Sequence, residues 1–118
     1  MDDERRAYVH ELMLAMDPGA DPAGPGAVVT AALCGGWEHE GPCRWPHHTA
    51  VSPAGDALRV RTVFVAAPED EHEVRARIAS ALVHAPGWFV IAGGPSQVTE
   101  DEAALAGRLL AGPFRQGA

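Results

Sequence analysis

Apolar residues near the start of the chain recur at the spacing of an α-helix. They stand at i, i+3, i+4 and i+7, which places them on one face: Val9, Leu12, Met13 and Met16. Acidic residues at positions 2–4 suit the positive end of the helix dipole, and Asp17-Pro18-Gly19 is a stop signal. We therefore predict an N-terminal segment, 1–16, that forms a helix over residues 3–16. A Pro/Gly linker over 17–26 follows it.

Two later segments have the pattern of β-strands. Residues 27–33 form a short apolar run, and residues 58–66 alternate with period two. The alternation predicts one face with Leu58, Val60, Thr62 and Phe64, and another with Arg59, Arg61, Val63 and Val65. The intervening loop, 34–57, is long for a compact domain, and such loops are usually functional or tied down. We expect the two strands to pair antiparallel across it.

The second half of the chain predicts a helix, a strand and a helix. Ala67-Pro68 opens a helix over 69–84, and residues 88–92 form a short buried strand that Gly93-Gly94-Pro95 ends. A capping box from Thr99 to Glu102 starts a last helix through about Ala111. The strand–helix–strand unit at 58–92 predicts a right-handed parallel crossover.

These elements predict a single α+β domain over 1–118. Its core, 27–112, holds a sheet of about three strands, an antiparallel pair plus one parallel βαβ crossover, covered by helices. Residues 113–118 form a flexible tail in this prediction. A three-stranded sheet has exposed edges and a small core, so pairing with a second chain as a homodimer would be a natural remedy.

Composition excludes some function classes. The chain carries 9 basic residues, all of them Arg, against 16 acidic ones, for a net charge of −7. Nucleic-acid binding needs clustered positive charge, which scattered Arg residues do not supply. The absence of Lys and Asn, with abundant Ala, Gly, Pro and Arg, indicates a GC-rich and bacterial coding bias. The N-terminus lacks the pattern of a signal peptide, and no apolar run is long enough to span a membrane. We therefore expect a cytoplasmic protein with reduced thiols.

Candidate chemistry is concentrated in the predicted loop. The segment Cys34–His48 holds both cysteines, three of the six histidines and two of the three tryptophans. Its spacing, Cys34-x4-His39-x3-Cys43-x3-His47-His48, offers sulfur and imidazole ligands of the kind that tetrahedral zinc prefers. Adjacent residues of an extended chain point to opposite sides, so we expect only one of His47 and His48 to bind. The sequence therefore predicts one zinc, or another divalent transition metal, held by Cys34, His39, Cys43 and His47 or His48.

The surroundings of the predicted ligands fit a metal site. Gly35-Gly36 and Gly41-Pro42 allow the backbone to turn closely, and Trp37 and Trp45 could exclude water. The spacing nevertheless matches neither the paired Cys-x2-Cys knuckle nor the Cys2His2 finger. Glycine and proline also rule out a helix through His39-Glu40-Gly41-Pro42-Cys43, which a metalloprotease pattern would require.

Other interpretations of the same residues stay open. The two cysteines could be buried thiols, or could form a disulfide in an oxidising compartment, and His47-His48 could be a surface pair that takes up nickel during purification. A cysteine nucleophile with a histidine base is a further alternative, although Glu38 and Glu40 would raise the thiol pKa.

Several remaining features predict structural roles. Gly93-Gly94-Pro95-Ser96 resembles a phosphate-binding turn in outline, but acidic residues 100–102 would repel an anion. Three histidines stand alone on predicted helices, where solvent-facing or capping roles are expected: His10, His72 and His84. Arg59 and Arg61 need carboxylate partners if their strand face is partly buried.

We therefore expect a small metal-binding α+β protein that acts as a binding or regulatory module rather than as an enzyme. In this hypothesis the metal orders the loop and presents Trp37 and Trp45 to a protein partner or a second subunit. The competing hypothesis is a small enzyme in which three ligands hold the metal and Glu38 or Glu40 is the general base. A metal-free interaction protein is the third possibility.

Overall fold

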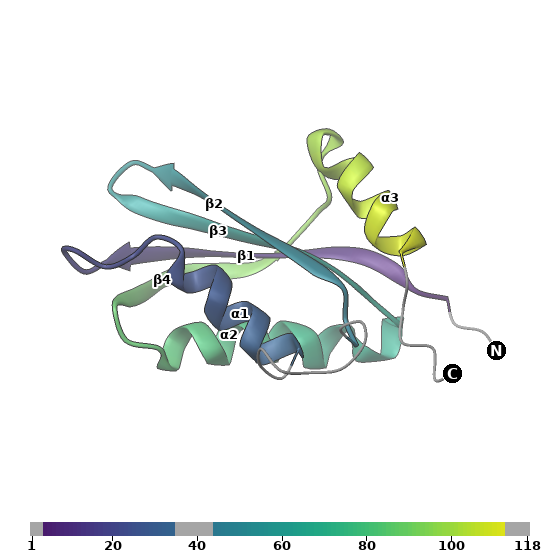
Figure 1. Cartoon of the computed structure of the whole chain (residues 1–118), viewed down its shortest axis with the longest axis horizontal. Coiled ribbons are helices and arrows are strands. Elements are labelled where there is room, and N and C mark those ends of the chain that lie inside the picture. Colours follow the sequence, from purple (N-terminus) through teal and green to yellow (C-terminus); the bar gives the residue numbers. More distant parts are fainter. Residues whose placement is uncertain (1–3, 35–43, 113–118) are drawn as a thin grey trace.

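The computed structural model describes residues 4–34 and 44–112 (Figure 1). In chain order its strands and helices are β1 (Arg6–Met16), α1 (Gly24–Cys34), β2 (His47–Ala54), β3 (Ala57–Ala66), η1 (Pro68–Asp70), α2 (Glu71–His84), β4 (Trp88–Ser96), η2 (Glu100–Glu102) and α3 (Ala103–Ala111). The sheet has four strands in the order β2-β3-β1-β4, and every neighbouring pair is antiparallel. This βαββαβ order is that of the split βαβ, or ferredoxin-like, motif, with α3 added at the C-terminal end.

One face of the sheet carries the main core. Even-numbered residues of β1 and β3, such as Leu12, Leu14, Val60 and Phe64, are buried there under α1 and α2 (Figure 1). The helices contribute apolar residues at i, i+4 spacing: Val29 and Leu33 from α1, and Val74, Ile78 and Leu82 from α2. Burial of these side chains is the main stabilising contribution to the fold.

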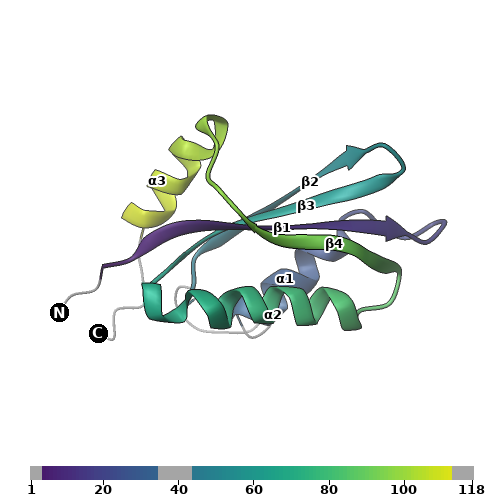
Figure 2. The same ribbon diagram turned by 180° about the vertical axis from the view of Figure 1, so that it is seen from behind.

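The opposite face of the sheet is covered only in part. Helix α3 lies on this side, as the view from behind also shows (Figure 2), and forms a small second cluster in which Ala106 packs with Val9 and Val63. Glu11 and Arg61 continue the same face beyond α3 and form a charged network there. The central strands β1 and β3 are therefore apolar on both faces at one end and charged on one face at the other.

The predicted helix over 3–16 is wrong, because residues 6–16 form the central strand β1. The true period is two: Tyr8, His10, Leu12 and Leu14 face the helix layer, and Val9 faces α3. A strand that is apolar on both faces also satisfies i, i+3, i+4 spacing by coincidence. Hydrogen bonding to β3 and β4 favours the strand over the helix. The local sequence pattern does not reveal these neighbouring strands.

The predicted strand over 27–33 is also wrong. These residues lie in α1, which begins at Gly24 with a buried Pro25, so the segment 17–26 is not wholly a linker without core residues. Cys34 consequently ends a helix rather than a strand. The predicted loop 34–57 contains β2, which forms a hairpin with β3, and the predicted antiparallel pairing of 27–33 with 58–66 does not occur.

The C-terminal half of the fold agrees better with expectation. Strand 58–66, helix 69–84 and the capped C-terminal helix are confirmed, including the reciprocal Thr99–Glu102 capping box. Strands β3 and β4 run parallel as predicted, but β1 lies between them, so the sheet has no adjacent parallel pair among the described residues. Gly93-Gly94-Pro95 continues β4 rather than ending it. The predicted tail 113–118 lies outside the described residues.

Candidate functional site

The end of α1 and the start of β2 bring two of the predicted metal ligands together. Cys34 Sγ lies 3.9 Å from Nδ1 of His47, although the two residues are thirteen positions apart. Thr30, one helical turn before Cys34, places its hydroxyl oxygen 3.3 Å from Nε2 of the same imidazole. The ring of His47 therefore lies along one face of α1, between a hydroxyl and a sulfur.

The environment of His47 fixes its protonation. Nδ1 lies 3.1 Å from the carbonyl oxygen of Trp45, and because a carbonyl only accepts, Nδ1 carries the proton. Nε2 then accepts from the Thr30 hydroxyl. Burial lowers the pKa of His47, and the nearby charge of His48 lowers it further. The imidazole is thus neutral near pH 7, which is the form that binds metals.

The strand separates the two adjacent histidines. His47 is half-buried toward α1, whereas His48 is exposed, and in the register of β2 with β3 they face opposite sides of the sheet. That only one of them binds a metal stays a prediction, and His47 is the one on the side of Cys34.

Trp45 belongs to the hydrophobic core rather than to the protein surface. Its side chain is 3% exposed, and the guanidinium groups of Arg44 and Arg77 lie 4.5 and 5.0 Å from its ring centroid. The indole N–H donates to Asp70 at 3.4 Å. Trp45 thus anchors the chain that enters β2, and its side chain is not available for presentation to a partner.

Cys34 is disulfide-bonded in this structure, so the expectation of reduced thiols is not met here and the disulfide alternative is the one present. Of the other residues predicted to form the site, His39, Cys43, Trp37, Glu38 and Glu40 lie outside the described residues. Within the described part, no three His, Cys, Asp or Glu side chains are grouped so as to hold a metal ion.

A second polar cluster, not recognised as one in the sequence, surrounds His10. This side chain is 7% exposed on β1, and its Nδ1 lies 3.1 Å from Nη1 of Arg75 on α2. Arg75 also donates to the Val9 carbonyl at 2.6 Å and to Glu71 at 2.8 Å. Burial and the Arg75 charge lower the pKa of His10 to about 4. The expectation of a solvent-facing His10 on a helix is therefore wrong; His72 and His84 are exposed on α2, as expected.

The arginine face of β3 is a structural network. Arg61 is bound by Glu11 and Glu102, so the carboxylate partners expected for this face are present. Arg59 is more exposed and lies 3.8 Å from Glu11. A cavity of about 540 Å³ is lined by these groups together with Ser96, Thr99 and Asp101. Its acidic side chains and the engaged Arg61 make it a poor anion site.

The chain matches no protein-family model, no curated protein and no solved structure at a significant level. No helix in the described part of the chain is long and apolar enough to cross a membrane. The βαββαβ topology is used for many unrelated functions, so it does not identify one here.

Proposed function

We propose that this chain is a small binding or regulatory module whose Cys34–His47 corner holds one zinc ion when the cysteines are reduced. The observation that carries the proposal is the 3.9 Å approach of Cys34 Sγ to the His47 ring, at the two ends of the segment that contains His39 and Cys43. A metal at this corner would link α1, β2 and the intervening segment. Such a site stabilises a fold by ordering a long connection.

The tautomer of His47 supports this role. With its proton on Nδ1 and bonded to the Trp45 carbonyl, the ring offers Nε2 as the metal-binding nitrogen. Zinc sites commonly orient a histidine ligand through such a carbonyl bond. Cys34 Sγ lies nearer Nδ1 in this structure, so a zinc shared by the two residues requires the freed thiolate to move to the Nε2 side of the ring, where Thr30 now lies.

The disulfide at Cys34 favours a second candidate function, a metal-free interaction module. In that case the covalent bond itself closes the segment after α1, and His47 serves as a buried hydrogen-bonding residue. A disulfide of this kind stabilises mainly by restricting the unfolded chain. The two candidates differ in redox state and in metal content.

Elemental analysis of the untagged protein tests the proposal. The chain is purified without chelating resin, once under a phosphine reductant and once without, beside a Cys34→Ser/Cys43→Ser double variant. We expect about one zinc per chain in the reduced wild type, and none in the double variant, because four ligands of this type hold one tetrahedral ion.

Metal content also separates the two candidates. A reduced wild type without zinc, together with two titratable thiols, contradicts the metal site and favours the metal-free module. Cobalt substitution then distinguishes a closed structural site from an open catalytic one, because only an open site changes its absorption spectrum when small anions are added.

A further inference from the structure

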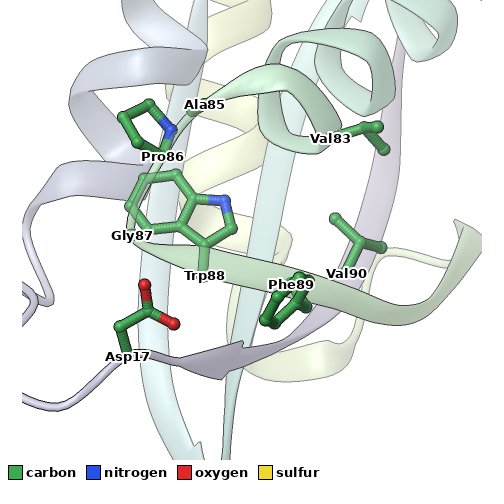
Figure 3. A pocket seen from close by; sticks show the side chains of 8 residues that line it. All are labelled: Asp17, Val83, Ala85, Pro86, Gly87, Trp88, Phe89 and Val90. Carbon is green, nitrogen blue, oxygen red and sulfur yellow. The ribbon is translucent and has the colours of Figure 1, made fainter.

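A cavity of about 540 Å³ lies where α2 ends and β4 begins (Figure 3). Its volume falls within the roughly 300–1,000 Å³ that is usual for small-molecule sites. The lining consists of Asp17 and of seven uncharged residues at positions 83 and 85–90. Asp17 is therefore the one charged residue of this lining, and neither Cys34 nor His47 belongs to it.

Hydrogen bonds hold the walls of this cavity in place. The backbone N–H of Asp17 donates to the carbonyl of Gly87 at 2.9 Å, which joins the turn after β1 to the turn before β4. The indole N–H of Trp88 donates to the Leu82 carbonyl at 2.9 Å. Gly87 has a φ of 109°, which L side chains rarely adopt, so this turn depends on glycine. The cavity is thus preformed, as ligand sites usually are.

The polar part of the lining is negative. The Asp17 carboxylate has no ion pair or hydrogen bond to any described residue, and no basic residue lines the cavity. Helix α2 ends beside it at His84, and the C-terminal end of a helix carries partial negative charge on carbonyls that lack intrahelical partners. Pro86 has no N–H to offer these carbonyls. Both groups favour a cation, and the net charge of −7 does so at longer range.

The rest of the cavity surface is apolar and open to solvent. Phe89 is 72% exposed, and Val83 on the last turn of α2 is 57% exposed. Figure 3 shows the Asp17 carboxylate directed toward the Trp88 side chain, with Val83 and Val90 on the other side of the indole. A ligand with its charge at Asp17 can therefore extend an apolar group over these side chains. Aromatic ring faces also attract cations.

We propose that this cavity binds a small organic cation, in which a protonated amine is joined to an apolar or aromatic body. The ammonium group lies at the Asp17 carboxylate near the end of α2, and the body covers Val83 and Phe89. A bare metal ion would gain nothing from the apolar side chains, and Asp17 would repel an anion. This site goes beyond the proposed zinc-binding role and does not depend on it.

Three probes that share a phenyl ring and differ in charge test the proposal: phenethylammonium, phenethyl alcohol and phenylacetate. Each is titrated into the nitrogen-15-labelled full chain in its metal-free disulfide form, and backbone amide shifts are followed. We expect phenethylammonium to shift the amides of Asp17 and residues 87–90 and to bind about three- to tenfold more tightly than the alcohol. Phenylacetate should bind more weakly than both. Added salt should weaken binding of the ammonium probe and leave the alcohol unaffected.

Matched variants assign the two parts of the site. Asp17→Asn removes the charge and keeps the backbone bond to Gly87, whereas Asp56→Asn changes the net charge equally at an exposed turn between β2 and β3. We expect Asp17→Asn to lower the affinity for phenethylammonium to that for the alcohol, and Asp56→Asn to bind like the wild type. Phe89→Ala should weaken both probes. Ile91→Ala should not, because Ile91 is 59% exposed on the same strand but outside the lining.

Three results would overturn the proposal. They are the absence of shifts at these amides at the highest probe concentration, equal affinities for the ammonium and the alcohol, and an Asp17→Asn variant that binds phenethylammonium like the wild type. The same amide spectra show whether each variant is folded. None of these outcomes depends on the metal content of the Cys34–His47 corner.

Discussion

Arg61 on β3 donates to both carboxylate oxygens of Glu102, each at 2.8 Å, and so joins the C-terminal helical segment to the sheet. The other donors of the guanidinium reach Glu11 at 2.6 Å, the Ser96 hydroxyl at 3.1 Å and the Gln97 carbonyl at 3.0 Å. All five N–H groups are thereby engaged. This pairing lowers the pKa of Glu102 to about 2 and raises that of Arg61.

Replacing this guanidinium should release α3 from the sheet. We expect Arg61→Lys to lower the free energy of unfolding by about 2–3 kcal/mol, because a lysine cannot make the bidentate bond to Glu102 and also reach Glu11, Ser96 and Gln97. Chemical denaturation measures the loss. Arg6→Lys is the control: its pair with Glu4 is mostly exposed, so it should change stability by less than about 0.5 kcal/mol. Equal effects of the two substitutions would contradict the structural role of Arg61.

The buried His10 should make the protein acid-sensitive. Its folded-state pKa of about 4 lies below the unfolded value of 6.5, so the unfolded chain binds the proton more tightly. Stability is therefore full above pH 6.5 and falls between pH 6.5 and 4, by about 3 kcal/mol for this group. Urea unfolding as a function of pH measures the slope. His10→Gln should reduce the slope of unfolding free energy against pH, and His47 should account for the slope that remains. An unchanged slope would refute the assignment to His10.

The glycines of β4 allow a matched test of the sheet. A Cβ at Gly93 would lie 2.8 Å from Cγ of Leu12 and 2.9 Å from the Glu11 carbonyl oxygen, whereas a Cβ at Gly94 has no atom within 4 Å. Gly93→Ala should therefore destabilise the protein by about 1–3 kcal/mol through overpacking. Gly94→Ala should be close to neutral or slightly stabilising. Thermal unfolding of both variants measures the difference. A Gly94→Ala variant less stable than Gly93→Ala would be inconsistent with the β1–β4 register.

The local sequence pattern predicted the elements that are specified by residues within the element itself. Strand 58–66 alternates clearly, α2 opens with proline and acidic residues, and Thr99 with Glu102 forms a capping box. In each case the residues that specify the element lie within it. The pattern was therefore sufficient for β3, α2 and the capped C-terminal helix, but not for the full extent of β4.

The N-terminal half required tertiary information. Strand β1 is central and apolar on both faces because Val9 packs under α3 while Leu12 and Leu14 pack under α1 and α2, so helical and strand periods coincide. The alanine-rich segment in α1 was mistaken for a strand for a similar reason, since only Val29 and Leu33 mark its buried side. Both errors also displaced the expected position of Cys34.

In the candidate site, the orientation of the two adjacent histidines was predictable from the sequence, but the surroundings of His47 were not. The opposite orientation of His47 and His48 follows from strand geometry, and the structure places them so. The neighbours of His47, Thr30 on α1 and the Trp45 carbonyl, could not be inferred because α1 was not recognised. The pairing of His10 with Arg75, sixty-five positions apart, has no local signal.

Zinc titration of two reduced single variants tests the central claim most directly. His47→Ala removes the ring beside Cys34, whereas His48→Ala removes an adjacent ring that faces the other side of the sheet. With a chromophoric chelator as competitor, we expect His47→Ala to weaken zinc binding by on the order of 100-fold or more and His48→Ala to leave it near the wild-type value. Equal affinities in both variants, or no competition by the wild type, would contradict a metal site at the Cys34–His47 corner.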